Sequence, residues 1–186
     1  MTIRLPRRLT APAAQRYVAG WFGTRELHVL APRLLATRAS NVPGSRELLE
    51  LAPAALYAQL VAGRANPALP PPFRPRTART LLRFAWLAAG TGQWFSGQTA
   101  HARPAIARRL REGGEPRFPP GIRDAQLLGG SVLDLLAREE GEEAVAQLAL
   151  APPENERRTL EQAFRGRSVV HTSGAWRAHL ARLAAV

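Results

Sequence analysis

The segment FAWLAAGTGQWFSGQ, residues 84–98, is the most informative stretch of this sequence for the fold. Apolar side chains occupy nearly every face of residues 76–97, which is typical of a helix buried at the centre of a protein. The same segment carries two tryptophans, Trp86 and Trp94, with small residues between them. It therefore predicts a central helix against which other helices pack.

Helical patterns flank this segment on both sides. Pro53 fits the first position of a helix of about three turns, and Gly63 fits its end. Residues 103–112 are amphipathic with a basic side. Residues 122–140 place one apolar stripe at helical spacing, formed by Leu128, Val132, Leu135 and Leu136. Further helices are predicted directly after Gly141, over residues 154–164 and over residues 172–183.

The segment ELHVL, residues 26–30, alternates and contains a β-branched valine, so it is the one stretch that predicts a strand. We therefore expect a mainly α protein that forms a single helical domain over residues 1–186. Within it we expect an N-terminal helical arm at residues 1–24 and a helical core at residues 25–186. At most a short strand or small sheet is expected near residues 25–30.

The composition is that of a globular protein, with 46% hydrophobic and 22% charged residues. Cysteine is absent, which excludes disulfides, thiolate nucleophiles and cysteine zinc sites and is compatible with a reducing cytoplasm. Arg16 interrupts the apolar run that an export signal requires, and no apolar stretch reaches the roughly 20 residues of a spanning helix. We expect a cytoplasmic protein without a membrane span.

The net charge of +12 is unevenly distributed along the chain. Residues 1–120 hold 18 arginines and 5 acidic residues, whereas residues 121–186 hold 8 arginines and 9 acidic residues. A basic face could attract polyanions. Its candidate anion-binding residues are Arg103, Arg108, Arg109 and Arg111, beside Arg74, Arg76 and Arg79. The competing interpretation is a set of separate solvated arginines, because the absence of lysine and the abundance of alanine, glycine and proline are typical of a GC-rich coding bias.

The usual motifs of hydrolytic enzymes are missing from the sequence. The four histidines, at positions 28, 101, 171 and 179, include no pair three to five residues apart, so no His-Glu-x-x-His zinc motif exists. No serine lies in a Gly-x-Ser-x-Gly motif. We therefore name no catalytic, cofactor-binding or metal-binding residue and expect no cofactor.

Three polar features of the C-terminal half have structural interpretations. Gly129, Gly130 and Ser131 could form an anion-binding turn, but small residues within a helical pattern more often indicate close helix packing. Asp134 and Arg138 lie four residues apart, which predicts a solvated ion pair. His179 is expected at the surface or half-buried beside Trp176.

Three stretches of the sequence resemble the helical half of the gluzincin metallopeptidases of the peptidase MA clan. In that family a second helix carries a Trp-Leu-x-Glu-Gly-x-x-x-Tyr/Trp pattern, whose glutamate is the third zinc ligand. Trp86, Leu87, Gly90 and Trp94 match this frame, but Ala89 occupies the position of the glutamate. The later segments GGSVLDLLAREEGEEAVAQLA and LEQAFRGRSVVHTSGAWRAHLARL are also similar to the family, and ELHVL resembles its upstream strand.

The resemblance also places the first zinc-binding helix of the family on ALYAQLVAG, residues 55–63. Ala55, Leu56 and Gln59 then stand where the first ligand, the general base and the second ligand belong. A methyl or alkyl group can neither coordinate zinc nor take a proton from water. The resemblance thus implies a zincin-like fold that has lost its zinc site, with an apolar cleft between residues 53–63 and 79–97.

Three functions are compatible with this sequence. The first is a catalytically inactive, zincin-like domain that acts as a binding or scaffold module, with another protein or peptide in the former cleft. The second is a basic protein that binds polyanions or nucleic acid. The third is an enzyme of unrecognised chemistry, in which carboxylates such as Asp124, Asp134 and Glu139 would converge in space.

Overall fold

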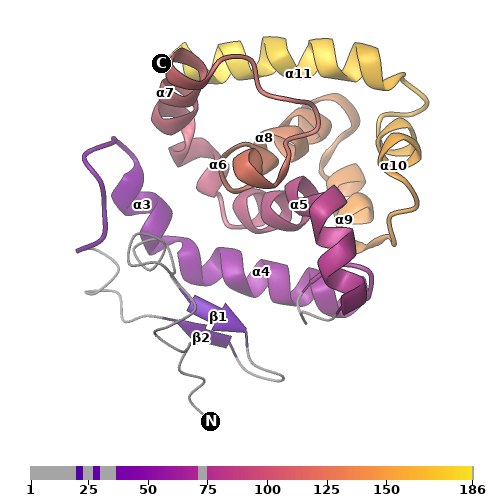
Figure 1. The fold of residues 1–186 in the computed structure, drawn as a ribbon, viewed down its shortest axis with the longest axis horizontal. Helices are drawn as coiled ribbons and strands as arrows, with labels where there is room; N and C mark the ends of the chain where they lie inside the picture. The colour runs from indigo at the N-terminus through magenta and orange to yellow at the C-terminus, as the bar shows by residue number, and fades with distance from the viewer. Residues whose placement is uncertain (1–19, 23–26, 30–36, 71–74, 186) are drawn as a thin grey trace.

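A computed structural model of the 186-residue chain describes residues 20–22, 27–29, 37–70 and 75–185. It is mainly helical, as the sequence predicts (Figure 1). The elements are β1 Gly20–Phe22, β2 Leu27–Val29, α3 Ser45–Glu50, α4 Ala52–Ala65, α5 Pro75–Phe95, α6 Gln98–His101, α7 Arg103–Gly113, α8 Ile122–Glu140, α9 Glu142–Leu150, α10 Glu156–Ala163 and α11 Val169–Ala184.

The two strands form an antiparallel pair in which Trp21 lies opposite His28. The pair contacts α4. Strand β2 lies within ELHVL, so the predicted strand is confirmed. Residues 20–22 form β1 where a helical arm over residues 1–24 was expected, because the aromatic residues Trp21 and Phe22 favour a strand once a partner strand is present. Residues 1–19 of that expected arm lie outside the described part of the chain.

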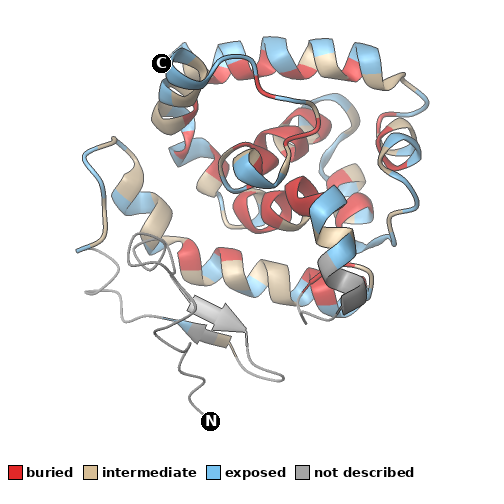
Figure 2. Ribbon diagram, in the orientation of Figure 1, coloured by how far each residue is buried: buried red, intermediate tan, exposed pale blue. Residues whose placement is uncertain are grey.

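Helices α5 and α8 form the centre of the molecule, where buried residues concentrate (Figure 2). Gly90 of α5 lies beside Gly129 of α8, and the side chain of Gln93 hydrogen-bonds to the carbonyl oxygen of Ala125. Helix α5 is kinked at Phe84, whose φ and ψ of −110° and 27° are not helical. The apolar stripe predicted for residues 122–140 is confirmed: Leu128, Val132, Leu135 and Leu136 are each at most 1% exposed.

The crossing of α5 and α8 depends on two glycines that face each other. A Cβ atom built on Gly90 would lie 2.6 Å from the carbonyl oxygen of Gly129, and one on Gly129 would lie 2.6 Å from that of Trp86. Backbone therefore packs directly on backbone. This confirms the close-packing interpretation of the Gly129–Ser131 segment.

The remaining helices cover this central pair. Figure 1 shows α11 and α4 on opposite sides of α5 and α8, and each contacts the nearer central helix. The short helices α6 and α7 connect α5 to α8 in sequence, while α9 and α10 lie between α8 and α11 along the chain. None of the helices in the described ranges is long and apolar enough to cross a membrane.

Candidate functional site

Three of the positions that the resemblance assigns to the lost zinc site, those of Ala55, Leu56 and Gln59, lie on α4, and the fourth, that of Ala89, lies on α5 in a buried cluster with Ala85 and Ala125. Ala55 is 7% exposed and Ala89 is 3% exposed, so both methyl groups are buried. A Cβ atom on Gly92 of α5 would lie 2.9 Å from the carbonyl oxygen of Ala55 and 2.7 Å from Nε2 of Gln59. The two helices touch at this level, so the expected apolar cleft is not open there.

These residues do not fit a zinc ion. Zinc in proteins is bound by histidine nitrogen, cysteine sulfur or carboxylate oxygen. Ala55, Leu56 and Ala89 have no such atom, and the remaining position carries only the amide of Gln59. In the described ranges, no group of three or more histidine, aspartate or glutamate side chains could hold a metal ion.

The residues of the tryptophan frame serve the core of the molecule. Trp86 and Leu87 are fully buried, Gly90 makes the contact with α8, and Trp94 is partly buried with Phe95 edge-on at 4.9 Å between ring centres. The indole Nε1 of Trp86 is buried and has no hydrogen-bond partner. An unpaired donor of this kind weakens the net stabilisation that burial of the ring gives.

Beside the frame, Gln93 provides a polar connection from α5 to α8. Its Nε2 donates to the carbonyl oxygens of Ala125 and Gln126 at 3.2 and 2.6 Å, and its Oε1 accepts from the amide of Gly130 at 2.6 Å. The side chain is thus paired at both ends of its amide. It acts as a structural tie between the central helices.

A second polar group lies between α8 and α11 and corrects two expectations. His179 is fully buried, and its Nε2 lies 2.8 Å from Oδ2 of Asp134. The expected ion pair of Asp134 with Arg138 is wrong, because α11 packs on the side of α8 that carries Asp134. The expectation that His179 would be exposed or half-buried is also wrong, for the same reason.

The neighbouring hydroxyl of Ser131 is committed to structural hydrogen bonds. It accepts from Nε1 of Trp176 at 2.9 Å and donates to the carbonyl oxygen of Leu128 at 2.6 Å. A catalytic serine needs a hydrogen bond to the histidine that removes its proton. Because Ser131 is hydrogen-bonded to Trp176 and Leu128, this serine, histidine and aspartate do not form a nucleophilic triad.

The four candidate anion-binding arginines of α7 divide into two pairs. Arg109 makes a bidentate ion pair with Asp124 at 2.8 and 2.9 Å, and Nε of Arg108 lies 2.9 Å from Oε1 of Glu112. Arg103 and Arg111 are exposed, and neither is ion-paired within the described ranges. Of these four candidates, Arg103 and Arg111 are therefore the ones whose side chains are free to meet a polyanion.

The Arg109–Asp124 pair joins α7 to the first turn of α8. The hydrogen bonds with Asp124 raise the pKa of the Arg109 guanidinium, partial burial lowers it by less, and the charge of Asp124 adds to the increase. A raised pKa of a basic group means that its contribution to stability is complete below the unfolded-state pKa and is lost only as the pH rises through the folded-state value. The guanidinium therefore stays charged at neutral pH.

The carboxylates considered for an enzyme do not converge. Asp124 pairs with Arg109, Asp134 with His179 and Glu139 with Arg167. Each partner belongs to a different segment of the chain. The three carboxylates therefore form separate ion pairs, each of which connects two different segments.

One arrangement had no signal in the sequence: a cavity between α9 and α10, at which Glu140 and Arg165 meet. The two residues lie 25 positions apart, so no local spacing connects them. Glu142 and Glu143, which follow Glu140 in the sequence, occupy the first turn of α9, where the helix dipole favours them.

No protein-family model matches this chain, and no curated protein or solved structure shows significant similarity to it.

Proposed function

We propose that this chain is a catalytically inactive, zincin-like helical domain that acts as a binding or scaffold module. The observation that supports the proposal best is the contact between α4 and α5. The positions that would hold zinc ligands carry Ala55, which is buried at this contact, and Ala89, which is buried in a cluster with Ala85 and Ala125, while Gln59 lies against Gly92. Side chains of this kind stabilise a helix contact and supply neither a Lewis acid nor a general base.

The first test is the metal content of protein purified without chelators or an affinity tag. We expect a zinc-to-protein ratio near zero and no peptidase activity. A ratio near one, or hydrolysis that a single substitution in the α4–α5 contact abolishes, would contradict the proposal.

A gain-of-binding variant tests the ancestry more sharply. Replacing Ala55→His, Gln59→His and Ala89→Glu supplies the ligand types of the family at the positions that the resemblance assigns. We expect this variant to bind one Co²⁺ or Zn²⁺ and to be more stable with the metal than without it, because metal binding to the folded state stabilises it. The matched control, Ala54→His, Ala58→His and Ala89→Glu, shifts both histidines by one residue and should bind no metal.

We further propose, as a second function, that the free arginines of α7 bind polyanions. The observation in its favour is that Arg103 and Arg111 are exposed and carry no ion pair in the described part of the chain. The carboxylate partners of Arg108 and Arg109 neutralise these two arginines, which argues against an extended basic surface. Two free guanidinium groups predict weak binding with a modest salt dependence.

Binding to a single-stranded oligonucleotide and to heparin, measured from 20 to 200 mM salt, tests this second function. We expect the variant Arg103→Gln/Arg111→Gln to bind several-fold more weakly than the parent and to lower the salt slope by about two. The control Arg157→Gln/Arg158→Gln removes the same charge from α10. Equal weakening by both variants would mean that only net charge matters, and binding independent of salt would exclude the function.

A further inference from the structure

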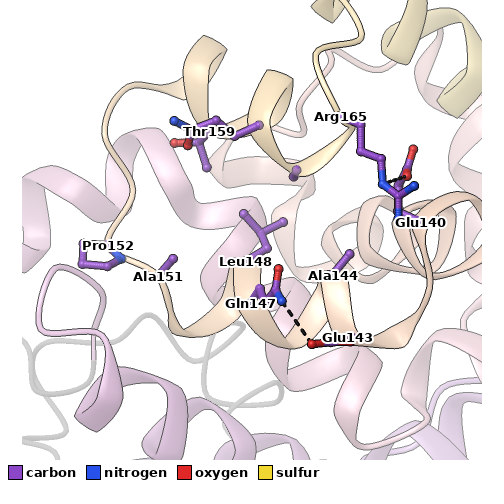
Figure 3. A pocket seen from close by; sticks show the side chains of 11 residues that line it. Glu140, Glu143, Ala144, Gln147, Leu148, Ala151, Pro152, Thr159 and Arg165 are labelled. Atoms are coloured by element: carbon purple, nitrogen blue, oxygen red, sulfur yellow. Dashed lines mark hydrogen bonds and ion pairs between the residues drawn. The ribbon is translucent and has the colours of Figure 1, made fainter.

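A cavity between α9 and α10 has no part in the packing of the central helices. Its volume is about 290 Å³, which suits a small group rather than a drug-sized molecule. Leu148, Ala144 and Ala163 supply apolar surface, and Figure 3 shows Ala151 and Pro152 at the end away from Arg165. None of its lining residues belongs to α4 or α5, so this site is independent of the zincin-like ancestry.

The charge of the cavity is opposite to that of the protein. Its lining holds two carboxylates, Glu140 and Glu143, and one guanidinium, that of Arg165. The net charge of the lining is therefore −1, in a chain whose net charge is +12. An electronegative cavity with apolar surface favours a cation that carries an alkyl chain.

The buried carboxylate is paired with an exposed partner. The side chain of Glu140 is 8% exposed, and its Oε2 lies 2.7 Å from Nε of Arg165, whose side chain is 76% exposed (Figure 3). A carboxylate this deeply buried needs a positive partner, but an exposed arginine contributes only modestly to such a pair. An incoming cation can therefore take the place of Arg165 without leaving a buried charge unpaired.

Two further features of the lining agree with an exchangeable partner. Arg165 follows α10 with a φ of 48°, a left-handed conformation that costs free energy for a residue other than glycine. Thr159 is 6% exposed, and its Oγ1 is buried without a hydrogen-bond partner. Thr159 is one of the residues that line the cavity.

We propose that this cavity binds a primary ammonium group on an alkyl chain. The ammonium replaces Arg165 at the carboxylate of Glu140, and the alkyl chain packs on Leu148 and its apolar neighbours. The same chemistry is present in free alkyl diamines and in lysine side chains of a polypeptide.

Calorimetric titration of the full chain with 1,5-diaminopentane and with a capped lysine, Nα-acetyl-lysine N-methylamide, tests the proposal. We expect saturable binding of one equivalent of at least one of them. Tighter binding of the capped lysine would identify a peptide as the source, and tighter binding of the diamine would identify a small amine. 1-Pentanol, which has the alkyl chain without the charge, should not bind.

Variants assign the binding to the cavity. Glu140→Gln should weaken ammonium binding at least tenfold, because it removes the buried charge. Arg165→Gly should strengthen binding, because it removes the competing cation. The control Glu112→Gln removes an exposed carboxylate of α7 and should leave the affinity unchanged. Circular dichroism and the unfolding midpoint of each variant establish that it is folded.

Three outcomes would overturn the proposal: no saturation by either amine at millimolar concentration, equal binding of 1-pentanol and the amines, or unchanged affinity in a folded Glu140→Gln variant. If Glu140→Gln does not fold, Arg165→Gly still decides the question. Its affinity should then exceed that of the parent, and an equal or lower affinity counts against the site.

Discussion

Replacing Gly129 with alanine is expected to lower the free energy of unfolding by about 3 kcal/mol, because the added methyl group meets backbone atoms that cannot move aside. The new Cβ would lie 2.6 Å from the carbonyl oxygen of Trp86 and 2.9 Å from the amide nitrogen of Gly90. Helices α5 and α8 would have to separate along their contact. Alanine gains about 1 kcal/mol over glycine in helix propensity, but this gain does not offset the loss.

Thermal and urea unfolding measure this effect. For a domain of this size, a loss of 3 kcal/mol lowers the midpoint of thermal unfolding by roughly 6–12 °C. The matched control is Gly174→Ala on α11, where an added Cβ meets no atom within 4 Å. That control should be neutral or stabilising by up to about 1 kcal/mol. If Gly129→Ala proves as stable as the control, the two helices do not touch through their backbones.

Replacing Trp176 with phenylalanine is expected to cost a similar amount, about 3 kcal/mol. The smaller ring leaves a cavity in a fully buried site, where Trp176 packs 5.2 Å from Phe118 between ring centres. The substitution also removes the 2.9 Å hydrogen bond from Nε1 to Ser131. Urea unfolding followed by circular dichroism is the suitable measurement, because the substitution itself changes the fluorescence.

Trp86→Phe is the comparison that separates the two contributions. Trp86 is equally buried, but its Nε1 has no hydrogen-bond partner, so its replacement loses volume and removes an unpaired donor. We expect Trp86→Phe to lower the free energy of unfolding by less than Trp176→Phe does, with a difference of at least about 1 kcal/mol. Equal losses in the two variants would show that the bond to Ser131 contributes nothing measurable.

Helices with strong periodicity could be predicted from the sequence with accurate bounds. Residues 122–140 combine an apolar stripe with a glycine directly after the last turn, and α8 has these bounds. Residues 103–112 begin with Pro104 in the first turn, and α7 spans Arg103–Gly113. In both cases the local signals and the tertiary packing favour the same ends.

Partners of polar side chains could not be predicted in the same way. The spacing of four residues predicted an ion pair between Asp134 and Arg138, whereas the tertiary structure places buried His179 against Asp134. The identity of a polar partner depends on which helix covers which face, and no local pattern specifies this. The cavity between α9 and α10 escaped prediction for the same reason, since it forms only when the turn after α10 returns to the end of α8.

The candidate zinc positions could be predicted only in part. The absence of zinc ligands at residues 55, 56, 59 and 89 is read directly from the sequence. That α4 and α5 touch beside Gly92, instead of leaving a cleft, depends on the separation of two helix axes. Small residues favour close approach of helices, but only the structure specifies which pair approaches.

The backbone contact of Gly90 and Gly129 also restricts how this molecule can move. At these two glycines, carbonyl oxygens and amide groups meet directly, and no side chain lies between the backbones that could change its rotamer to permit sliding. Leu133 also lies close to Gly90, so we expect α5 and α8 to move together where they cross. Any displacement on ligand binding is then expected in the helices around this pair.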